Sequence, residues 1–259
     1  MTEYLLFRLY GPMASWGEIA VGESRHSSSY PSRSALVGLL GAALGIYRND
    51  DDAQLALTNG YRFATKVLSI GTPMQDFHTI QSPMEMKMVV YRKRAQELAN
   101  RQTVETLLSM REYRCDSLAL VAVEALTGAR WPLVELRSKL INPAFPLYLG
   151  RKSCPLALPL APMLVTAENL FDAFRAKQYS ILALTARHKD EAKAEWPTSE
   201  DMHVLRLHHQ IPSYRWEDGM EAGMKPDMQV IRHDQPLSRR RWRFAPRREY
   251  VRQEQEKAQ

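Results

Sequence analysis

The chain has 259 residues, of which 45% are hydrophobic and 25% are charged, and its formal net charge is +6. This composition is ordinary for a globular protein, so it excludes a disordered chain that is too polar to bury a core. The longest apolar stretches are too short and too rich in glycine to cross a bilayer, and no signal-peptide pattern is visible. We therefore expect a cytoplasmic protein with no membrane partner.

Hydrophobic periodicity predicts an α+β fold. Alternation between polar and apolar residues is typical of strands, and leucines at spacings of three and four after a possible capping residue, Ser32 or Ser34, are typical of a helix. The expected elements are a strand at 4–10, a helix at 35–46, a short helix through Leu57, a strand at 61–70, an insertion at 76–114, a strand at 117–125, a helix at 132–140 and a strand within 143–160. This order is the split βαβ plan of a ferredoxin-like domain, which is RRM-like but is shared by unrelated proteins.

The sequence predicts three parts. Residues 1–75 and 115–162 form the ferredoxin-like domain, which is interrupted by residues 76–114, a polar, basic and methionine-rich insertion with a helical stretch from about Lys93 to Met110. Residues 163–259 form a C-terminal extension with weaker patterning. The elements expected in this extension are a helix at 168–177 and strands at 181–185, 204–208 and 228–232.

Six arginines gather in residues 239–248, together with a tryptophan and a phenylalanine, and they account for the whole net charge. Such a segment is typical of a footprint for phosphate and stacked bases, and the alternative is a solvated basic tail. Further basic residues stand at expected loops and turns beside tyrosine, serine or tryptophan. Arginine forks match phosphate geometry, so these residues are candidates for binding RNA.

Catalysis has less support. The sequence contains no GxxxxGK[ST], GxGxxG, HExxH or GxSxG motif. Two cysteines lack CxxC neighbours, and His203, His208 and His209 lack an obvious carboxylate or thiol partner, so we expect no metal and no cofactor. A metal-independent ribonuclease would need a general base and a general acid, which His26 with Tyr30, or His78 with Lys87, could supply.

Four segments resemble a known family, in the family's order. They are residues 4–17, 31–46, 111–116 and 148–156, and the most specific is the run Tyr-Leu-Gly-Arg-Lys-Ser-Cys-Pro that begins at Tyr148. These segments are similar to the CasD-type subunits, the fifth Cas protein family, of type I-E CRISPR Cascade complexes. Fainter similarity covers 76–79, 232–236 and 243–244, whereas the middle of the insertion and residues 165–225 match poorly.

The resemblance implies a palm with a protruding thumb, which would be residues 76–114. It implies a non-catalytic subunit that binds the 5′ handle of the CRISPR RNA (crRNA) and caps the backbone filament. The implied partners are the handle, the Cascade backbone subunit, the large PAM-reading subunit and, indirectly through the complex, the target DNA. The alternative is a metal-independent endoribonuclease that processes CRISPR repeat RNA, as the related type I-C subunit does.

The resemblance and the basic positions together nominate RNA-binding residues and no catalytic residue. The expected set is Trp16, Arg25, Arg33, His78, Arg111, Tyr113, Arg114, Arg151, Lys152, Ser153, Arg241 and Arg243. Tyr113 would contact a base and Ser153 a phosphate, while Trp16 is open between base stacking and core packing, and Tyr148 and Cys115 are expected in the core. The insertion's methionines, Met84, Met86, Met88 and Met110, are expected to pack on the neighbouring backbone subunit.

Overall fold

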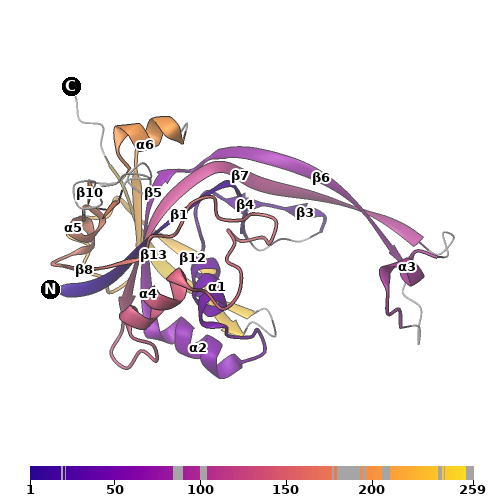
Figure 1. Cartoon of the computed structure of the whole chain (residues 1–259), viewed down its shortest axis with the longest axis horizontal. Helices are drawn as coiled ribbons and strands as arrows, with labels where there is room; N and C mark the ends of the chain where they lie inside the picture. Colours follow the sequence, from indigo (N-terminus) through magenta and orange to yellow (C-terminus); the bar gives the residue numbers. More distant parts are fainter. Residues whose placement is uncertain are drawn as a thin grey trace.

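A computed structural model describes residues 1–18, 20, 22–83, 90–99, 104–176, 178–179, 193–194, 197–205, 211–238, 241 and 243–254. Its centre is a large, mostly antiparallel sheet (Figure 1). The strands of this sheet are β1 (Thr2–Ala14), β3 (Ser24–Arg25), β5 (Tyr61–Ser69), β6 (Thr72–Pro83), β7 (Val104–Ala125), β8 (Met163–Ala167), β11 (Ser213–Glu217), β12 (Met228–Ser238) and β13 (Arg243–Gln253). The strand order is β12-β13-β11-β5-β7-β1-β8, and β3 and β6 pair with outer parts of β7.

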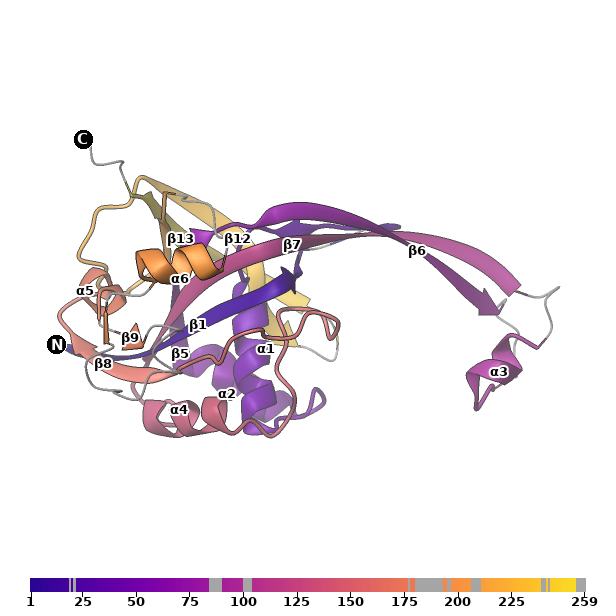
Figure 2. The ribbon, with the colours of Figure 1, turned by 45° about the horizontal axis from the view of Figure 1, so that its top comes forward.

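Helices cover both faces of the sheet (Figure 2). One face carries α1 (Arg33–Leu44), α2 (Asp51–Gly60) and α4 (Leu133–Ile141), and the other carries α5 (Leu170–Phe174) and α6 (Ser199–Val204). The short elements are β2 (Trp16–Gly17), β4 (Ser27–Ser28), β9 (Gln178–Tyr179), β10 (Lys193–Ala194) and α3 (Arg94–Glu97). Among the described helices, none combines the length and the apolar character that a bilayer crossing requires.

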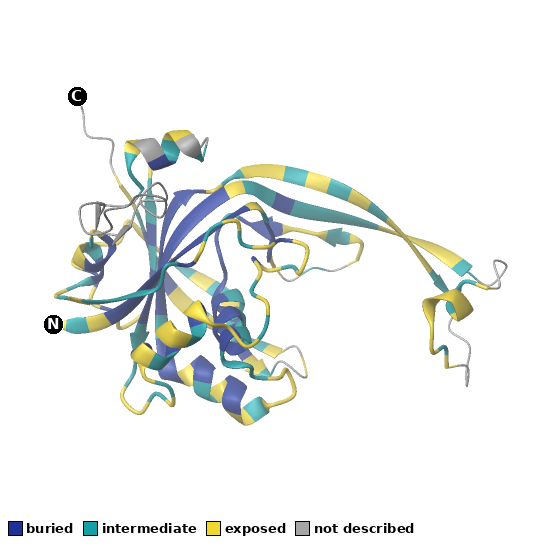
Figure 3. Ribbon diagram, in the orientation of Figure 1, coloured by how far each residue is buried: buried dark blue, intermediate teal, exposed yellow. Residues whose placement is uncertain are grey.

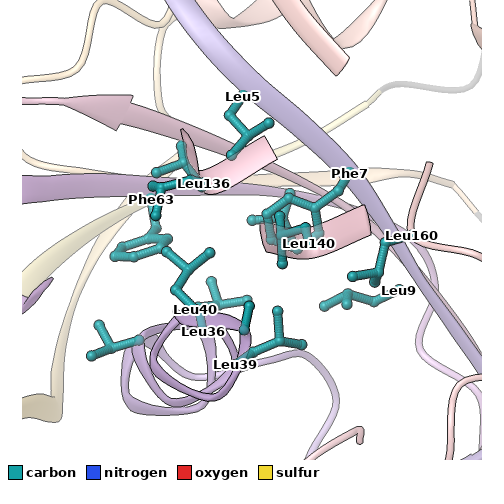
Figure 4. Close-up of a cluster of buried hydrophobic side chains, with 14 of the residues drawn as sticks. Leu5, Phe7, Leu9, Leu36, Leu39, Leu40, Phe63, Leu136, Leu140 and Leu160 are labelled. Atoms are coloured by element: carbon teal, nitrogen blue, oxygen red, sulfur yellow. The ribbon is translucent and has the colours of Figure 1, made fainter. Parts of the chain in front are cut away.

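The principal core lies between β1 and the first group of helices (Figure 4). Alternation along β1 points its odd-numbered side chains at this core, and the helical spacing of leucines gives α1 one apolar face. The residues that meet there include Leu5, Phe7, Leu9, Leu36, Leu39, Leu40, Phe63, Leu136, Leu140 and Leu160. Of the two serines considered as the cap of α1, it is Ser32 whose side chain accepts from the Ala35 N–H.

The second face of β1 is also buried, although its sequence is less apolar. Arg8 is only 1% exposed, and its Nε donates to the Pro159 carbonyl over 3.0 Å. Burial lowers the pKa of Arg8, and the charge of Asp201 opposes that shift. The C-terminal region supplies this cover, so it packs on the sheet as part of the same body.

β6 and β7 extend beyond the rest of the sheet as a two-stranded arm, with α3 at its far end (Figure 1). Their antiparallel register runs without a break from Thr72 opposite Cys115 to Pro83 opposite Val104. Most of the arm is exposed or only partly buried, in contrast to the central strands (Figure 3). The helix expected over Lys93–Met110 is therefore wrong apart from α3, because cross-strand pairing overrides the helical propensity of that segment.

Two other expected strands differ from the structure. Residues 143–160 form no ladder apart from the bridge between Tyr148 and Pro155, because their prolines lack the N–H groups that a ladder requires. The edge strand is β8 instead. Val204, expected to begin a strand, ends α6. The helix expected at 168–177 is the shorter α5, and the expected strand at 181–185 lies outside the described residues.

The arginine-rich end is not a tail, because residues from Arg243 onward form β13 between β11 and β12. Arg247 lies in a buried ion network. Its Nε donates to Asp234 Oδ1 over 2.6 Å, and its Nη2 donates to Glu249 Oε2 over 2.7 Å. Burial alone would raise the pKa of Asp234, but the hydrogen bonds and charge of Arg247 outweigh burial and hold that pKa below its ordinary value.

Arg33 joins this network from the first turn of α1. Its Nε donates to Glu217 Oε1 over 2.8 Å, and its backbone N–H donates to Asp234 Oδ2 over 2.7 Å. Its Nη2 donates to the carbonyls of Thr58 and Tyr61. The network thus joins α1 and α2 to the three C-terminal strands.

We predict that Arg247→Met destabilises the chain by about 3–5 kcal/mol, because it leaves the carboxylates of Asp234 and Glu249 buried without their partner. Arg248→Met is the matched control, since Arg248 is exposed on the same strand and should cost less than about 0.5 kcal/mol. Urea denaturation measures both changes. Equal midpoints for the two variants would contradict the role assigned to the network.

Candidate nucleic-acid interface

The loop of residues 148–155 is a tight turn anchored by two fully buried side chains, Leu149 and Cys154. The Leu149 N–H donates to the Cys154 carbonyl over 2.8 Å. Gly150 has φ +84°, and a Cβ there would lie 1.8 Å from the Ser15 carbonyl oxygen, so only glycine fits. The three residues that follow, Arg151, Lys152 and Ser153, are consequently at the exposed tip of the loop.

A second loop lies against the root of the arm and is held there by Glu112 on β7. The Glu112 carboxylate accepts from the Ser27 N–H over 3.2 Å and lies 3.1 Å from His26 Nδ1. The Ser27 N–H holds the pKa of Glu112 below its ordinary value, and the bonds from His26 and Gln75 act in the same direction. These contacts fix β3 beside β7, where Arg25 pairs with Arg111 in parallel register.

The two loops place Arg25 and Arg151 beside the root of β7, which itself carries Arg111 and Arg114, and we call these four residues the arginine rim. Arg114 Nη2 donates to the Ser27 carbonyl over 3.4 Å, and Arg151 Nη2 donates to the Arg25 carbonyl over 3.4 Å. Backbone carbonyls carry no net charge, so these two bonds leave the positive charges of Arg114 and Arg151 in place, whereas the carboxylate of Asp76 stands opposite Arg111 across the arm. Arg25 is exposed and the other three are partly exposed, which suits them to phosphate.

Beside the rim is a cavity of about 610 Å³, which we call the α1 pocket. It is lined by small residues of α1, by the 146–151 loop and by β12. Its charged lining residues are Glu18, Arg151, Arg232 and Asp234, and its aromatic lining residues are Tyr148 and Phe244. Tyr148 is 42% exposed, which corrects its expected core position. A cavity of this size with aromatic and cationic walls can hold a nucleotide.

Three of the expected RNA contacts have buried side chains. Arg33 is enclosed in the ion network, while Trp16 and Tyr113 belong to the principal core and are 3% and 4% exposed. Of the two roles considered for Trp16, base stacking and core packing, the structure therefore shows core packing. Tyr113 supports the rim from below, since Arg151 Cζ lies 4.9 Å from its ring centroid. The burial of these three side chains corrects their expected contact with RNA.

The remaining expected residues lie outside the rim. His78 is on the arm, opposite Ser109, with its Nε2 2.5 Å from Asp76 Oδ2. Arg241 and Arg243 are exposed near the connection between β12 and β13, and Arg243 adjoins Phe244 of the α1 pocket. Cys115 is half-buried and beside Met74.

Of the acid–base pairs considered for RNA cleavage, His26 with Tyr30 has its two members bonded to different carboxylates. Tyr30 is buried, its hydroxyl donates to Glu249 Oε1 over 2.8 Å, and burial raises its pKa above the ordinary value. His26 instead faces Glu112 on the other side of the loop. Lys87, the partner considered for His78, lies outside the described residues, as do His208 and His209; His203 is exposed on α6.

Sequence reasoning missed Glu112, Glu18 and Arg232 as site residues. A signal existed for Glu112, because it stands between the two arginines of the Arg-Glu-Tyr-Arg run. Arg232 lies in the faintly similar segment 232–236, but nothing in the sequence pairs it with Glu18, because the two residues are far apart in the chain and meet only when β12 folds beside α1.

The comparisons with known proteins decide the family. The model of the family described as CRISPR-associated protein (Cas_Cas5) matches residues 4–250. The chain belongs to the Cas5 family. A relative from Escherichia coli (strain K12), the CRISPR system Cascade subunit CasD, is 34% identical over 169 residues, which cover 62% of this chain and 70% of the relative.

Two solved structures have the same fold as this Cas5 chain. A chain of a CRISPR RNA-guided surveillance complex matches with a TM-score of 0.62 and 22% identity, covering 97% of this chain and 90% of that chain. A crystal structure of a Cas protein matches with a TM-score of 0.53 and 26% identity, covering 97% and 93%. The match to the Cas5 model includes the whole arginine rim and the whole α1 pocket.

We predict that Gly150→Ala displaces the loop that carries Arg151. The substitution should destabilise the chain by more than about 1–2 kcal/mol, which is the cost of an alanine in the left-handed conformation without a steric clash. Gly128→Ala is the matched control, because Gly128 has φ +83° but no atoms near its added Cβ. Thermal denaturation measures the difference between the two. A Tm for Gly150→Ala equal to that of Gly128→Ala would show that the contact with Ser15 is unimportant.

Proposed function

We propose that this Cas5 protein is a non-catalytic subunit of a type I-E Cascade surveillance complex, in which it binds the 5′ handle of crRNA and caps the backbone filament. The observation that carries the proposal is the arginine rim, whose four arginines come from three separate segments and of which Arg151 also lines a nucleotide-sized pocket. The similarity to a relative named as a Cascade subunit supports it. Such a complex acts on nucleic acids in the cytoplasm.

The proposed fold is a ferredoxin-like palm with a thumb. The order β5-β7-β1-β8, with α1 after β1 and α4 after β7, supports the palm. We place the palm at residues 1–75 and 115–162, extended to Ala167 because β8 is its fourth strand, with the thumb at 76–114. The third part is the C-terminal region through residue 259, whose described residues cover the second face of the sheet and extend its edge.

The proposed RNA contacts are the rim together with Lys152, Ser153, Arg241, Arg243 and, on the thumb, His78. Arginines from separate loops fix the path of a single strand by many phosphate contacts, and Tyr148 and Phe244 offer faces on which bases can stack. The large PAM-reading subunit and the target DNA would meet this protein only in the assembled complex.

The first experiment incubates the purified chain with its cognate repeat RNA, with and without EDTA, followed by a mobility-shift gel and a denaturing gel. We expect a shift with intact RNA, and we expect Arg114→Gln or Arg151→Gln to weaken binding by about tenfold, because a hydrogen bond to a charged group contributes about 1.5–3 kcal/mol. A discrete cut that survives EDTA would instead identify a processing endoribonuclease. Wild-type binding that neither substitution weakens would contradict the proposed site.

We also propose that the thumb packs on a neighbouring backbone subunit. Phe77 and Leu108 are 66% and 45% exposed, and their pairing with Met110 and Thr79 places all four side chains on one face of the arm. Met84, Met86 and Met88 lie outside the described residues. An exposed apolar strip of this kind is typical of a protein interface.

The double substitution Phe77→Ser and Leu108→Ser should reduce the yield of co-purified complex at least about tenfold, because two large apolar anchors are lost. The free chain should keep its Tm, since both side chains are exposed. Gln81→Ser on the same face is the control. Normal complex yield from the double variant would refute packing through this face.

A further inference from the structure

The carboxylates of Asp234 and Glu18 line the α1 pocket, and they have different hydrogen-bond and ion-pair partners. Asp234 is bound by Arg247 and by the Arg33 N–H within the buried network. Glu18 is exposed, and its Oε1 lies 3.4 Å from Nη2 of Arg232 on β12. The contact joins the segment after β2 to β12, so this ion pair spans two walls of the pocket.

Arg232 has a second support that does not involve Glu18. Its Cζ lies 5.1 Å from the ring centroid of Tyr30, and Tyr30 is fixed by its bond to Glu249 and by Arg215 on its ring. The Arg232 side chain is 23% exposed and that of Glu18 is 45% exposed. The Arg232 guanidinium therefore keeps the support of Tyr30 when the more exposed Glu18 carboxylate moves away.

Exposed ion pairs contribute little, because water and salt screen them and two long side chains must be ordered. A phosphodiester competes well for the same guanidinium, since it accepts paired hydrogen bonds in the planar geometry that arginine offers. A carboxylate left beside a bound phosphate would oppose binding by charge repulsion. Glu18 and an RNA phosphate therefore compete for the Arg232 guanidinium.

We propose that Glu18 occupies, in the RNA-free chain, the place of a phosphodiester group, and that an RNA phosphate replaces it on Arg232 when a nucleotide enters the α1 pocket. This inference rests on the proposed RNA-binding function. It assigns Arg232 as a phosphate-binding residue and Glu18 as an internal competitor. RNA gains from the exchange because its base also contacts Tyr148 and Phe244, which line the same pocket.

The test uses fluorescence polarisation of a labelled handle RNA, the repeat-derived segment 5′ of the guide, with the full chain and then with the reconstituted complex. Glu18→Gln should tighten binding by about three- to fivefold, the scale set by an exposed ion pair. Glu23→Gln is the matched control for net charge, since Glu23 is exposed in the same loop and outside the pocket. Arg232→Gln should weaken binding by about tenfold.

Glu18→Gln should tighten binding less in the Arg232→Gln background than in the wild type, because loss of the arginine removes the competition and leaves only the charge repulsion between Glu18 and the phosphate. Tm values establish that each variant is folded, and Arg232→Lys, which keeps the charge, should bind better than Arg232→Gln. Glu18→Gln binding equal to or weaker than that of Glu23→Gln would overturn the inference. Failure of the wild type to bind in both forms would contradict the proposed function instead.

Discussion

A buried network of charged side chains joins the parts of this protein. Arg33 at the start of α1 meets Glu217 and Asp234, and Arg247 meets Asp234 and Glu249. Each carboxylate in it has an arginine partner, which is the condition under which charges are tolerated in a protein interior. Because Asp234 binds both α1 and β13, the distance between that helix and the C-terminal strands is fixed by directional bonds.

The site depends on that constraint. The α1 pocket lies between α1 and β12, so the network that sets their separation also sets the width of the pocket. Glu112 and Gly150 act in the same way on the other side, where they fix the two loops that carry Arg25 and Arg151 of the arginine rim. Rigid supports of this kind let several weak phosphate contacts act on one path of RNA without a cost for ordering the loops.

The sequence predicts the elements with strong periodicity, such as β1, α1, β5 and α4, because each buries a regular apolar face. It does not predict the length of β7, since the outer half of that strand is stabilised by pairing with β6 and buries little. It also misassigns Arg33 and Arg247. The residues next to an arginine in the sequence do not distinguish a buried arginine with acidic partners from a surface arginine. Only the fold shows that Asp234 lies beside both Arg33 and Arg247.

The arginine rim is the part of the site that local sequence predicts, because Arg25, Arg111, Arg114 and Arg151 all stand beside serine, tyrosine or other polar residues. The pocket is not predictable in this way, because its aromatic and acidic walls come from three segments that lie far apart in the sequence, around Glu18, Tyr148 and Asp234. Glu18 and Arg232 form a contact that depends on the docking of β12. Long-range packing thus decides which charged residues face RNA and which stabilise the interior.

The most direct test of the account is photo-crosslinking of the handle RNA in the assembled complex, followed by mass spectrometry of the crosslinked peptides. The account predicts adducts in the peptides that contain Tyr148 and Phe244, which line the pocket beside the rim. Adducts confined to the opposite face of the sheet, near α5 and α6, would contradict it.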